Sequence, residues 1–133
     1  MNKEQSNLHT PPYLKRGDKI GLISTARKIS KKELQIAIEK IESWGLKIKL
    51  GENLFNSYYQ FSANDDSRKR DLQNMLDDDD IKAIICARGG YGTVRIIDKI
   101  NFKKFQKYPK WVVGFSDVTV LHSHIHILNI ASI

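Results

Sequence analysis

The sequence predicts an α/β fold in which a mostly parallel sheet is covered by helices on both faces. Short apolar runs that suit buried strands alternate along the chain with helical patterns, in the order β-α-β-α-β-α-β-α. Consecutive strands joined through helices in this way pair in parallel. The 133 residues, 41% hydrophobic and 28% charged, suffice for one globular domain with a core of its own.

The first part of the chain carries a strand, a helix and a second strand. Residues 1–13 are polar and are expected to form a flexible arm ahead of a domain spanning residues 14–133. Residues 19–24 form an apolar run that suits a buried strand, and residues 46–50 alternate in hydrophobicity. Between them a capping box, Ser30 to Glu33, predicts the start of a helix. Its apolar side comprises Leu34, Ala37, Ile38, Ile41 and Trp44, and it ends at Gly45.

The rest of the chain continues the alternation. A helix is predicted over residues 66–76, a strand over 81–87 and a further helix over 92–100, where apolar residues recur at helical spacing. A strand over 111–114 and a helix over 118–128 follow, and the last four residues, 130–133, are largely apolar.

Composition argues against several classes of partner. The net charge of +7 comes from basic residues that are dispersed and interleaved with acids, so it indicates a solvated surface and not a nucleic-acid site. No apolar run is long enough to span a membrane, and the N-terminus lacks a secretory signal. The single cysteine, Cys86, lies in an apolar run and suits a reducing compartment. A cytoplasmic protein without membrane partners is expected.

Ser116 stands where an apolar run, residues 111–113, gives way to a helical pattern. A sharp turn from strand to helix exposes the side chain at its apex and points the following N–H groups at the atom that this side chain attacks. This is the geometry of a nucleophile elbow, although Val118 stands where the usual Gly-x-Ser-x-Gly pattern has a small residue. The alternative is that Ser116 only caps the helix.

A glycine-rich loop, residues 87–92, directly follows the third predicted strand. Gly89, Gly90 and Gly92 free the backbone to approach a ligand and to present N–H groups to a phosphate or an oxyanion. A tight turn that merely needs glycine is the alternative. Because parallel strands end at one edge of a sheet, this loop and Ser116 are expected together, which suggests acyl transfer by a serine with an oxyanion hole.

No base or metal ligand set accompanies the serine. His122, His124 and His126 lie on the helix that leads away from the turn, and no third ligand matches the pair at positions 122 and 126. The acidic run at residues 77–80 suits a solvated turn. Neither a metal nor a cofactor is predicted.

Four segments together resemble the LD-carboxypeptidase family, which includes muramoyltetrapeptide carboxypeptidases and microcin C self-immunity serine peptidases. The segments are LKRGDKIGLISTAR, QFSANDDSRKRDLQNML, IKAIICARGGYGTVRIID and KWVVGFSDVTVLHSHI. The resemblance implies a Rossmann-like or flavodoxin-like N-terminal layer followed by a β-rich domain. It also implies a Ser-Glu-His triad whose Glu and His lie in that second domain.

By this resemblance Ser116 matches the nucleophile. The backbone N–H groups of Asp117 and Gly90, or Gly89 in its place, match the oxyanion hole, and Arg88 and Tyr91 are expected to bind substrate. The implied activity removes a terminal D-Ala from cytoplasmic murein tetrapeptides during cell-wall recycling. The full-length protein is expected to be a homodimer, and the present chain, lacking the Glu and His, to be inactive alone.

Two other functions remain open. One is a microcin-immunity-type serine amidohydrolase that acts on an acyl-sulfamoyl or peptide-nucleotide substrate. The other is a non-catalytic flavodoxin-like domain whose glycine loop holds a phosphate or nucleotide.

Overall fold

Four parallel strands form the centre of the molecule, as the sequence predicts. The computed structural model describes residues 8–133. The strands are β1 (Lys19–Ile23), β2 (Lys47–Leu50), β3 (Ile81–Cys86) and β4 (Trp111–Val113), in the spatial order β2-β1-β3-β4. Every adjacent pair is parallel, with Ile20 beside Ala83 and Ile84 beside Val112. The predicted α/β fold class is therefore confirmed.

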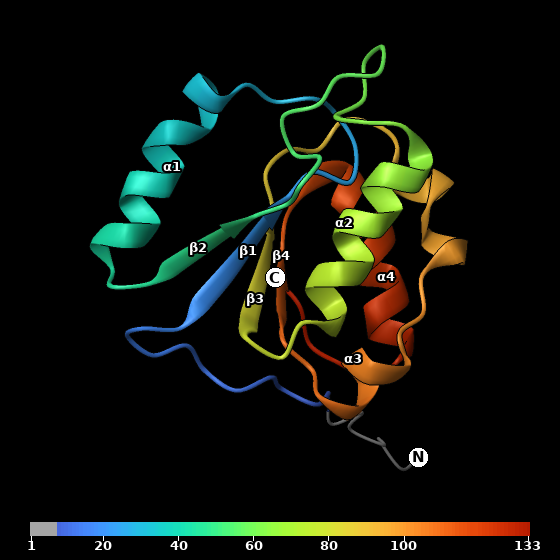
Figure 1. The fold of residues 1–133 in the computed structure, drawn as a ribbon. Coiled ribbons are helices and arrows are strands. Elements are labelled where there is room, and N and C mark those ends of the chain that lie inside the picture. Colours follow the sequence, from blue (N-terminus) through green and yellow to red (C-terminus); the bar gives the residue numbers. More distant parts are fainter. Residues whose placement is uncertain (1–7) are drawn as a thin grey trace.

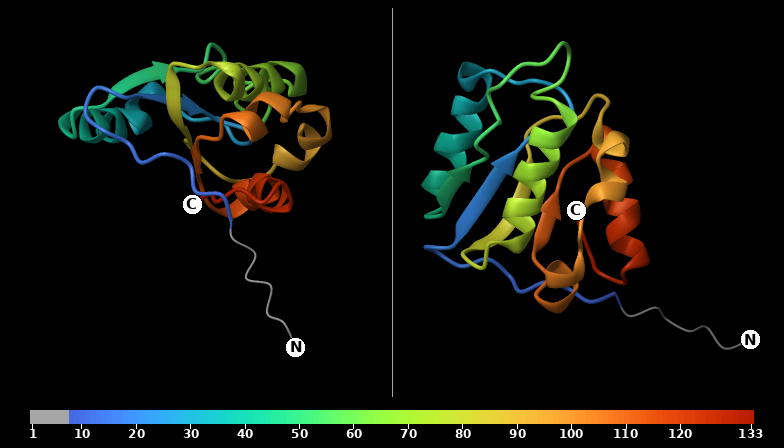
Figure 2. Two further views of the ribbon diagram at one scale, coloured as in Figure 1. Left: turned by 90° about the horizontal axis from the view of Figure 1, so that it is seen from below. Right: turned by 45° about the vertical axis from the view of Figure 1, so that its right-hand side comes forward.

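Helices cover the two faces of this sheet unequally (Figures 1 and 2). Helix α1 (Lys31–Ser43) packs on one face, whereas α2 (Asp65–Asp77), α3 (Lys103–Lys107) and α4 (Thr119–Ile127) pack on the other. The larger core lies between β3, β4 and these three helices, and it includes Leu72, Phe105 and Leu121. Among the described residues, no helix has the length and apolar character that crossing a membrane requires.

The helix ends follow from local sequence. The capping box at α1 forms, because Ser30 N donates to Glu33 Oε2 at 2.8 Å and Glu33 N donates to Ser30 Oγ at 3.2 Å. These bonds from Ser30 lower the pKa of Glu33. Gly45, with φ +82°, supplies the left-handed residue after this helix. At α2 the side chain of Asn64 accepts a hydrogen bond from Ser67 N at 2.9 Å.

The helix predicted over residues 92–100 is wrong in type. Two 3₁₀ turns, η1 (Thr93–Arg95) and η2 (Ile97–Lys99), replace it, and the short α3 that follows was not predicted. The consecutive residues Ile96 and Ile97 are both buried. Successive side chains of an α-helix point about 100° apart, so an interrupted backbone allows both isoleucines to enter the core.

The N-terminal residues that the structure describes are held against the domain. His9 N donates to Asn129 O at 2.8 Å, and Ala131 N donates to His9 O at 2.9 Å. Trp111 Nε1 donates to Pro12 O at 3.0 Å. Figure 2 shows this segment running along the lower edge of the sheet. Residues 1–7 of the predicted flexible arm lie outside the described residues. The rest of the arm, from His9 onward, is bonded to the domain and is not a free arm.

Candidate active site at the carboxyl edge of the sheet

The glycine loop and Ser116 meet at the carboxyl edge of the sheet. The loop follows β3, and Ser116 begins the 3₁₀ turn η3 (Ser116–Val118) shortly after β4. Because β3 and β4 are adjacent and parallel, both connections leave the sheet at the same edge, at the top of Figure 1. The sequence prediction that they lie together is borne out.

Ser116 occupies a strained turn and not a capping position. Its φ is +60°, in the left-handed region that favours glycine, and its side chain is exposed. Neither η3 nor α4 has a side-chain cap, and no hydrogen bond joins the Ser116 hydroxyl to another described residue. Helix capping therefore does not explain this serine. Strain at an exposed serine on a strand-to-helix turn is typical of a nucleophile elbow.

The packing of Gly114 against Val118 explains the departure from the usual elbow pattern. A Cβ on Gly114 would lie 2.7 Å from Val118 Cγ1, so a glycine is required here. Val118 is completely buried. The valine fills space that the glycine leaves open, and the bulky residue two places after Ser116 is thereby accommodated.

Gly89 is the glycine that packs directly on the serine. A Cβ at Gly89 would lie 2.8 Å from Ser116 Cβ and 3.1 Å from Ser116 Oγ. Gly90 has φ +110°, and its own Cβ would meet the side chain of Arg27. Both glycines are needed, one for close approach to Ser116 and the other for its backbone conformation.

Asp117 links the serine turn to the glycine loop through its side chain. Its Oδ2 accepts a hydrogen bond from Thr93 N at 2.9 Å. The Thr93 hydroxyl is bonded in turn to the hydroxyl of Thr25, in the loop after β1, at 2.7 Å. Connections that leave three different strands are thus joined around the serine.

The two residues expected to bind substrate differ in their surroundings. Arg88 Nη1 donates to Lys28 O at 3.2 Å and to Glu33 Oε1 at 3.3 Å, so its guanidinium contacts the start of α1. Tyr91 is 49% exposed, and its ring lies 6.2 Å from that of Phe61. Their roles stay predictions.

The nearby histidine supports the turn. His122 Nε2 lies 2.8 Å from Gly114 O, which can only accept, so this nitrogen carries the hydrogen. His122 Nδ1 lies 2.8 Å from Ser132 Oγ. Within residues 8–133 no group of three or more His, Cys, Asp or Glu side chains is placed to hold a metal ion.

A buried arginine beside the site was missed by sequence reasoning. Arg68 on α2 is 1% exposed, and it donates to Thr25 O, Ala63 O, Gly92 O and Asp65 Oδ1. Asp65 also accepts hydrogen bonds from Arg95, whose Nε–H is shared between both carboxylate oxygens and whose Nη2 donates to Oδ2. The two arginines lower the pKa of Asp65, and Arg95 contributes most. One signal was available, because Arg68 stands four residues before Leu72, on the apolar side of the predicted helix.

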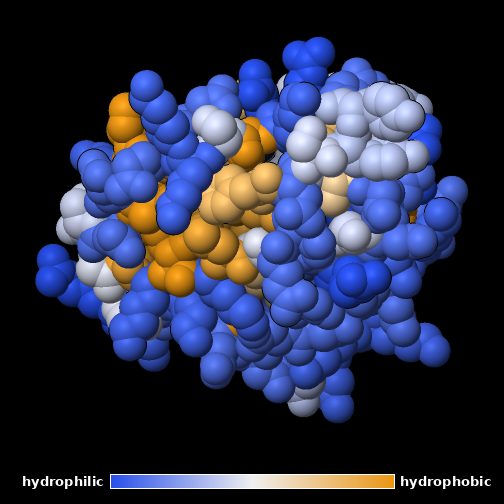
Figure 3. Space-filling model, turned by 45° about the horizontal axis from the view of Figure 1, so that its top comes forward, coloured by the Kyte–Doolittle hydropathy of each residue, from blue (hydrophilic) through white to orange (hydrophobic). Residues whose placement is uncertain are grey.

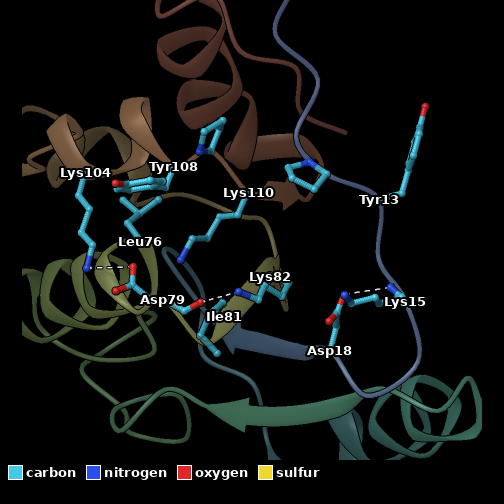
Figure 4. A pocket seen from close by; sticks show the side chains of 12 residues that line it. Tyr13, Lys15, Asp18, Leu76, Asp79, Ile81, Lys82, Lys104, Tyr108 and Lys110 are labelled. Carbon is cyan, nitrogen blue, oxygen red and sulfur yellow. Dashed lines mark hydrogen bonds and ion pairs between the residues drawn. The ribbon is translucent and has the colours of Figure 1, made fainter.

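The opposite edge of the sheet carries a separate pocket of about 360 Å³. Four lysines line it, as Figure 4 shows, namely Lys15, Lys82, Lys104 and Lys110. Lys82 Nζ already donates to Asp79 O, and Lys110 Nζ donates to Met75 O and Asp78 O. Because this pocket lies at the opposite edge of the sheet from Ser116 and the glycine loop, the candidate site remains at the carboxyl edge.

An apolar area enclosed by hydrophilic side chains is visible where the carboxyl edge comes forward (Figure 3). Phe115, next to the serine, is 73% exposed, and Val94 in η1 is 48% exposed. Apolar surface of this kind favours contact with a ligand or with another protein surface.

The chain is similar to known carboxypeptidases in sequence and in fold. The chain is 42% identical over 118 residues to the "Probable murein peptide carboxypeptidase" of Bacillus subtilis, a match that covers 89% of this chain and 37% of that protein. It superposes on the crystal structure of muramoyltetrapeptide carboxypeptidase from Oxalobacter formigenes with a TM-score of 0.78 and 30% identity, covering 86% of this chain and 38% of that one.

A third protein, an MccF-like protein from Bacillus anthracis, gives a TM-score of 0.84 and 25% identity, and covers 90% of this chain and 37% of that one. The chain thus spans somewhat more than a third of the length of these relatives. Residues 20–133 match the family described as LD-carboxypeptidase N-terminal domain. This chain therefore belongs to the LD-carboxypeptidase family, as an N-terminal domain of it.

Proposed function

We propose that the protein containing this chain is a serine-type LD-carboxypeptidase that removes a terminal D-Ala from murein tetrapeptides in the cytoplasm. The observation that carries the proposal is the strained, exposed Ser116 packed against Gly89 at the carboxyl edge of the sheet. The family membership adds the class of reaction, and the names of the relatives add the class of substrate.

In the proposed mechanism the Ser116 hydroxyl attacks the carbonyl carbon of the bond to the terminal residue. The hydroxyl proton passes to a general base and from it to the nitrogen of the terminal amino acid, which leaves as the C–N bond breaks and the acyl-enzyme forms. The backbone N–H of Asp117 and that of Gly90 or Gly89 stabilise the negative charge that develops on the carbonyl oxygen. Water then hydrolyses the acyl-enzyme.

The base is expected outside the present chain. Both ring nitrogens of His122 are bonded, to Ser132 and to Gly114, and the family resemblance assigns the base to a second domain. We therefore propose that the 133-residue chain alone does not turn over a murein tetrapeptide, because a neutral serine without a base is a weak nucleophile.

The test is release of D-Ala from a murein tetrapeptide by the full-length protein. The matched substrate ends in L-Ala, and the matched variant is Ser116→Ala. The proposal expects release from the D-Ala substrate only, and loss of nearly all turnover in the variant. Full activity of Ser116→Ala would contradict the proposed role of the serine.

A second activity is favoured by the likeness to the MccF-like protein. A microcin-immunity-type amidohydrolase would use the same serine but would cleave an acyl-sulfamoyl nucleoside. Release of aspartate from aspartyl sulfamoyl adenosine, measured beside release of D-Ala from the murein tetrapeptide, distinguishes the two activities, and Ser116→Ala should abolish either one.

A further inference from the structure

A single peptide group in the glycine loop is bonded at both of its ends. The carbonyl of Gly92 and the N–H of Thr93 belong to the same planar peptide. Arg68 Nη2 donates to this carbonyl at 3.3 Å, and Asp117 Oδ2 accepts from this N–H at 2.9 Å. A buried cation and a carboxylate thus hold the peptide from opposite sides.

The Arg68 end is built into the interior of the domain. Its guanidinium donates four hydrogen bonds, to three carbonyls and one carboxylate, and it lies 4.5 Å from the centre of the Phe61 ring. Gly92, with φ +143°, fits so closely that a Cβ would meet Ala26 Cα, Arg68 Nη2 and Phe61 Cδ1, each at 3.2 Å. Only glycine can place its carbonyl here.

The Asp117 end lies on the turn that carries the serine. Thr93 is completely buried, and its N–H donates to Asp117 Oδ2. Loss of that acceptor would leave a buried donor unpaired. The glycine loop therefore cannot shift relative to Ser116 without breaking a bond at one end of this peptide.

We propose that Arg68 and the side chain of Asp117 are positioning residues, which hold the glycine loop against Ser116 by clamping the Gly92–Thr93 peptide. This inference rests on the proposed function for its catalytic consequence, though not for the clamp itself. The clamp fixes the direction of the loop N–H groups that are proposed to bind the oxyanion. A displacement of about 1 Å in such a site can cost about 10²-fold in rate.

The clamp is tested without activity by measuring exchange of the Thr93 amide hydrogen in the full-length protein. The Ile84 amide in β3 serves as the reference for opening of the whole domain. Asp117→Ala and Arg68→Lys should each speed Thr93 exchange by about 10-fold or more relative to Ile84. Asp117→Asn, whose amide oxygen can still accept, should stay close to the native protein.

Arg95→Gln is the matched control for Arg68. It removes a guanidinium from the same Asp65 carboxylate, whereas the one bond from Arg95 to Gly92, in which Arg95 N donates to Gly92 O at 3.1 Å, comes from the backbone and is kept in the variant. Thr93 exchange should be unchanged in this variant. Unchanged exchange in both Asp117→Ala and Arg68→Lys would overturn the clamp.

The catalytic consequence is tested in the same variants. Asp117→Ala keeps its backbone N–H, yet kcat on the murein tetrapeptide should fall by about 10-fold or more while KM changes by less than about threefold. Asp117→Asn should restore most of kcat. Faster Thr93 exchange with an unchanged kcat would overturn the positioning role. Inactivity of the native full-length protein on this substrate would instead count against the proposed function and leave the exchange result standing.

Discussion

At the scale of single residues, local sequence predicted the two parts of the site that depend on their own neighbours. Ser116 follows an apolar strand and precedes a helical pattern, and Gly89 and Gly90 follow another strand. Because parallel strands end at the same edge of a sheet, the sequence predicted that these residues lie together. Arg68, Thr93 and the Asp117 carboxylate could not be predicted in the same way. Their contacts join loops far apart in the chain, and no spacing in the sequence encodes that pairing.

The strain at Ser116 has a measurable cost. A non-glycine residue in the left-handed region costs about 1–2 kcal/mol of stability. Glycine avoids this cost, but its greater conformational freedom in the unfolded chain offsets part of the gain. Ser116→Gly should therefore be about 1 kcal/mol more stable than Ser116→Ala, which keeps the strain. Urea unfolding of the two variants measures this difference. Equal stability would show that the turn is not strained.

Gly90 offers a second residue-scale test, with Gly17 as its control. Both have a positive φ, +110° and +90°, but Gly17 lies away from the glycine loop with open space around it. Alanine should cost about 1 kcal/mol of stability at Gly17, and more at Gly90, where its Cβ would lie 3.1 Å from Arg27 Cβ. Only Gly90→Ala should lower kcat as well. A parallel loss of activity in Gly17→Ala would indicate that strain alone, and not the site, accounts for the effect.

At the scale of elements, all four strands and the helices α1, α2 and α4 correspond to predicted segments, because each has a clear apolar period or a cap. The interval between β3 and β4 was mispredicted because the spacing of Val94, Ile97 and Ile100 imitates a helix. Val94 is in fact 48% exposed, and the buried pair is Ile96 and Ile97. Burial of these two isoleucines in the core therefore decided the backbone conformation here, and the helical spacing of apolar residues did not.

Lys110 gives helix α2 a stability that depends on pH. Its Nζ caps the last carbonyls of the helix from a position only 6% exposed, and burial lowers its pKa to about 8. Between pH 8 and the ordinary value of 10.5, the unfolded chain holds a proton that the folded protein has released. Stability therefore rises with pH in this range.

Relative to Lys110→Met, which cannot titrate, the native protein should gain on the order of 2 kcal/mol between pH 7 and pH 10. Denaturant unfolding at the two pH values gives the difference. A difference in unfolding free energy between the two proteins that is the same at both pH values would contradict the lowered pKa. The size of that difference is not the test, because the variant lacks the two capping bonds at either pH.

At the scale of the whole molecule, the N-terminal segment closes one side of the domain. His9, Pro12 and Tyr13 contact residues 129–131 and Trp111, where polar composition had suggested a loose arm. Polar composition indicates only that a segment can be solvated. It does not predict hydrogen bonds to segments about a hundred residues away in the chain. Sequence reasoning had no signal for them.

Removal of residues 1–13 should lower the unfolding free energy by about 3 kcal/mol, since three hydrogen bonds are lost and each is worth about 1 kcal/mol. Removal of residues 1–7 is the matched control, because it leaves His9, Pro12 and Tyr13 in place. Thermal unfolding of both truncated forms measures the effect. Identical midpoints for the two would mean that these contacts add nothing to stability.

Covalent labelling shows whether Ser116 acts as a nucleophile. The full-length protein is treated with a serine-directed phosphonylating probe and analysed by peptide mass spectrometry, beside the Ser116→Ala variant. The account predicts one added mass on the peptide that contains Ser116, lost in the variant together with turnover. Labelling at another serine, or a Ser116→Ala protein that still releases D-Ala, would contradict it.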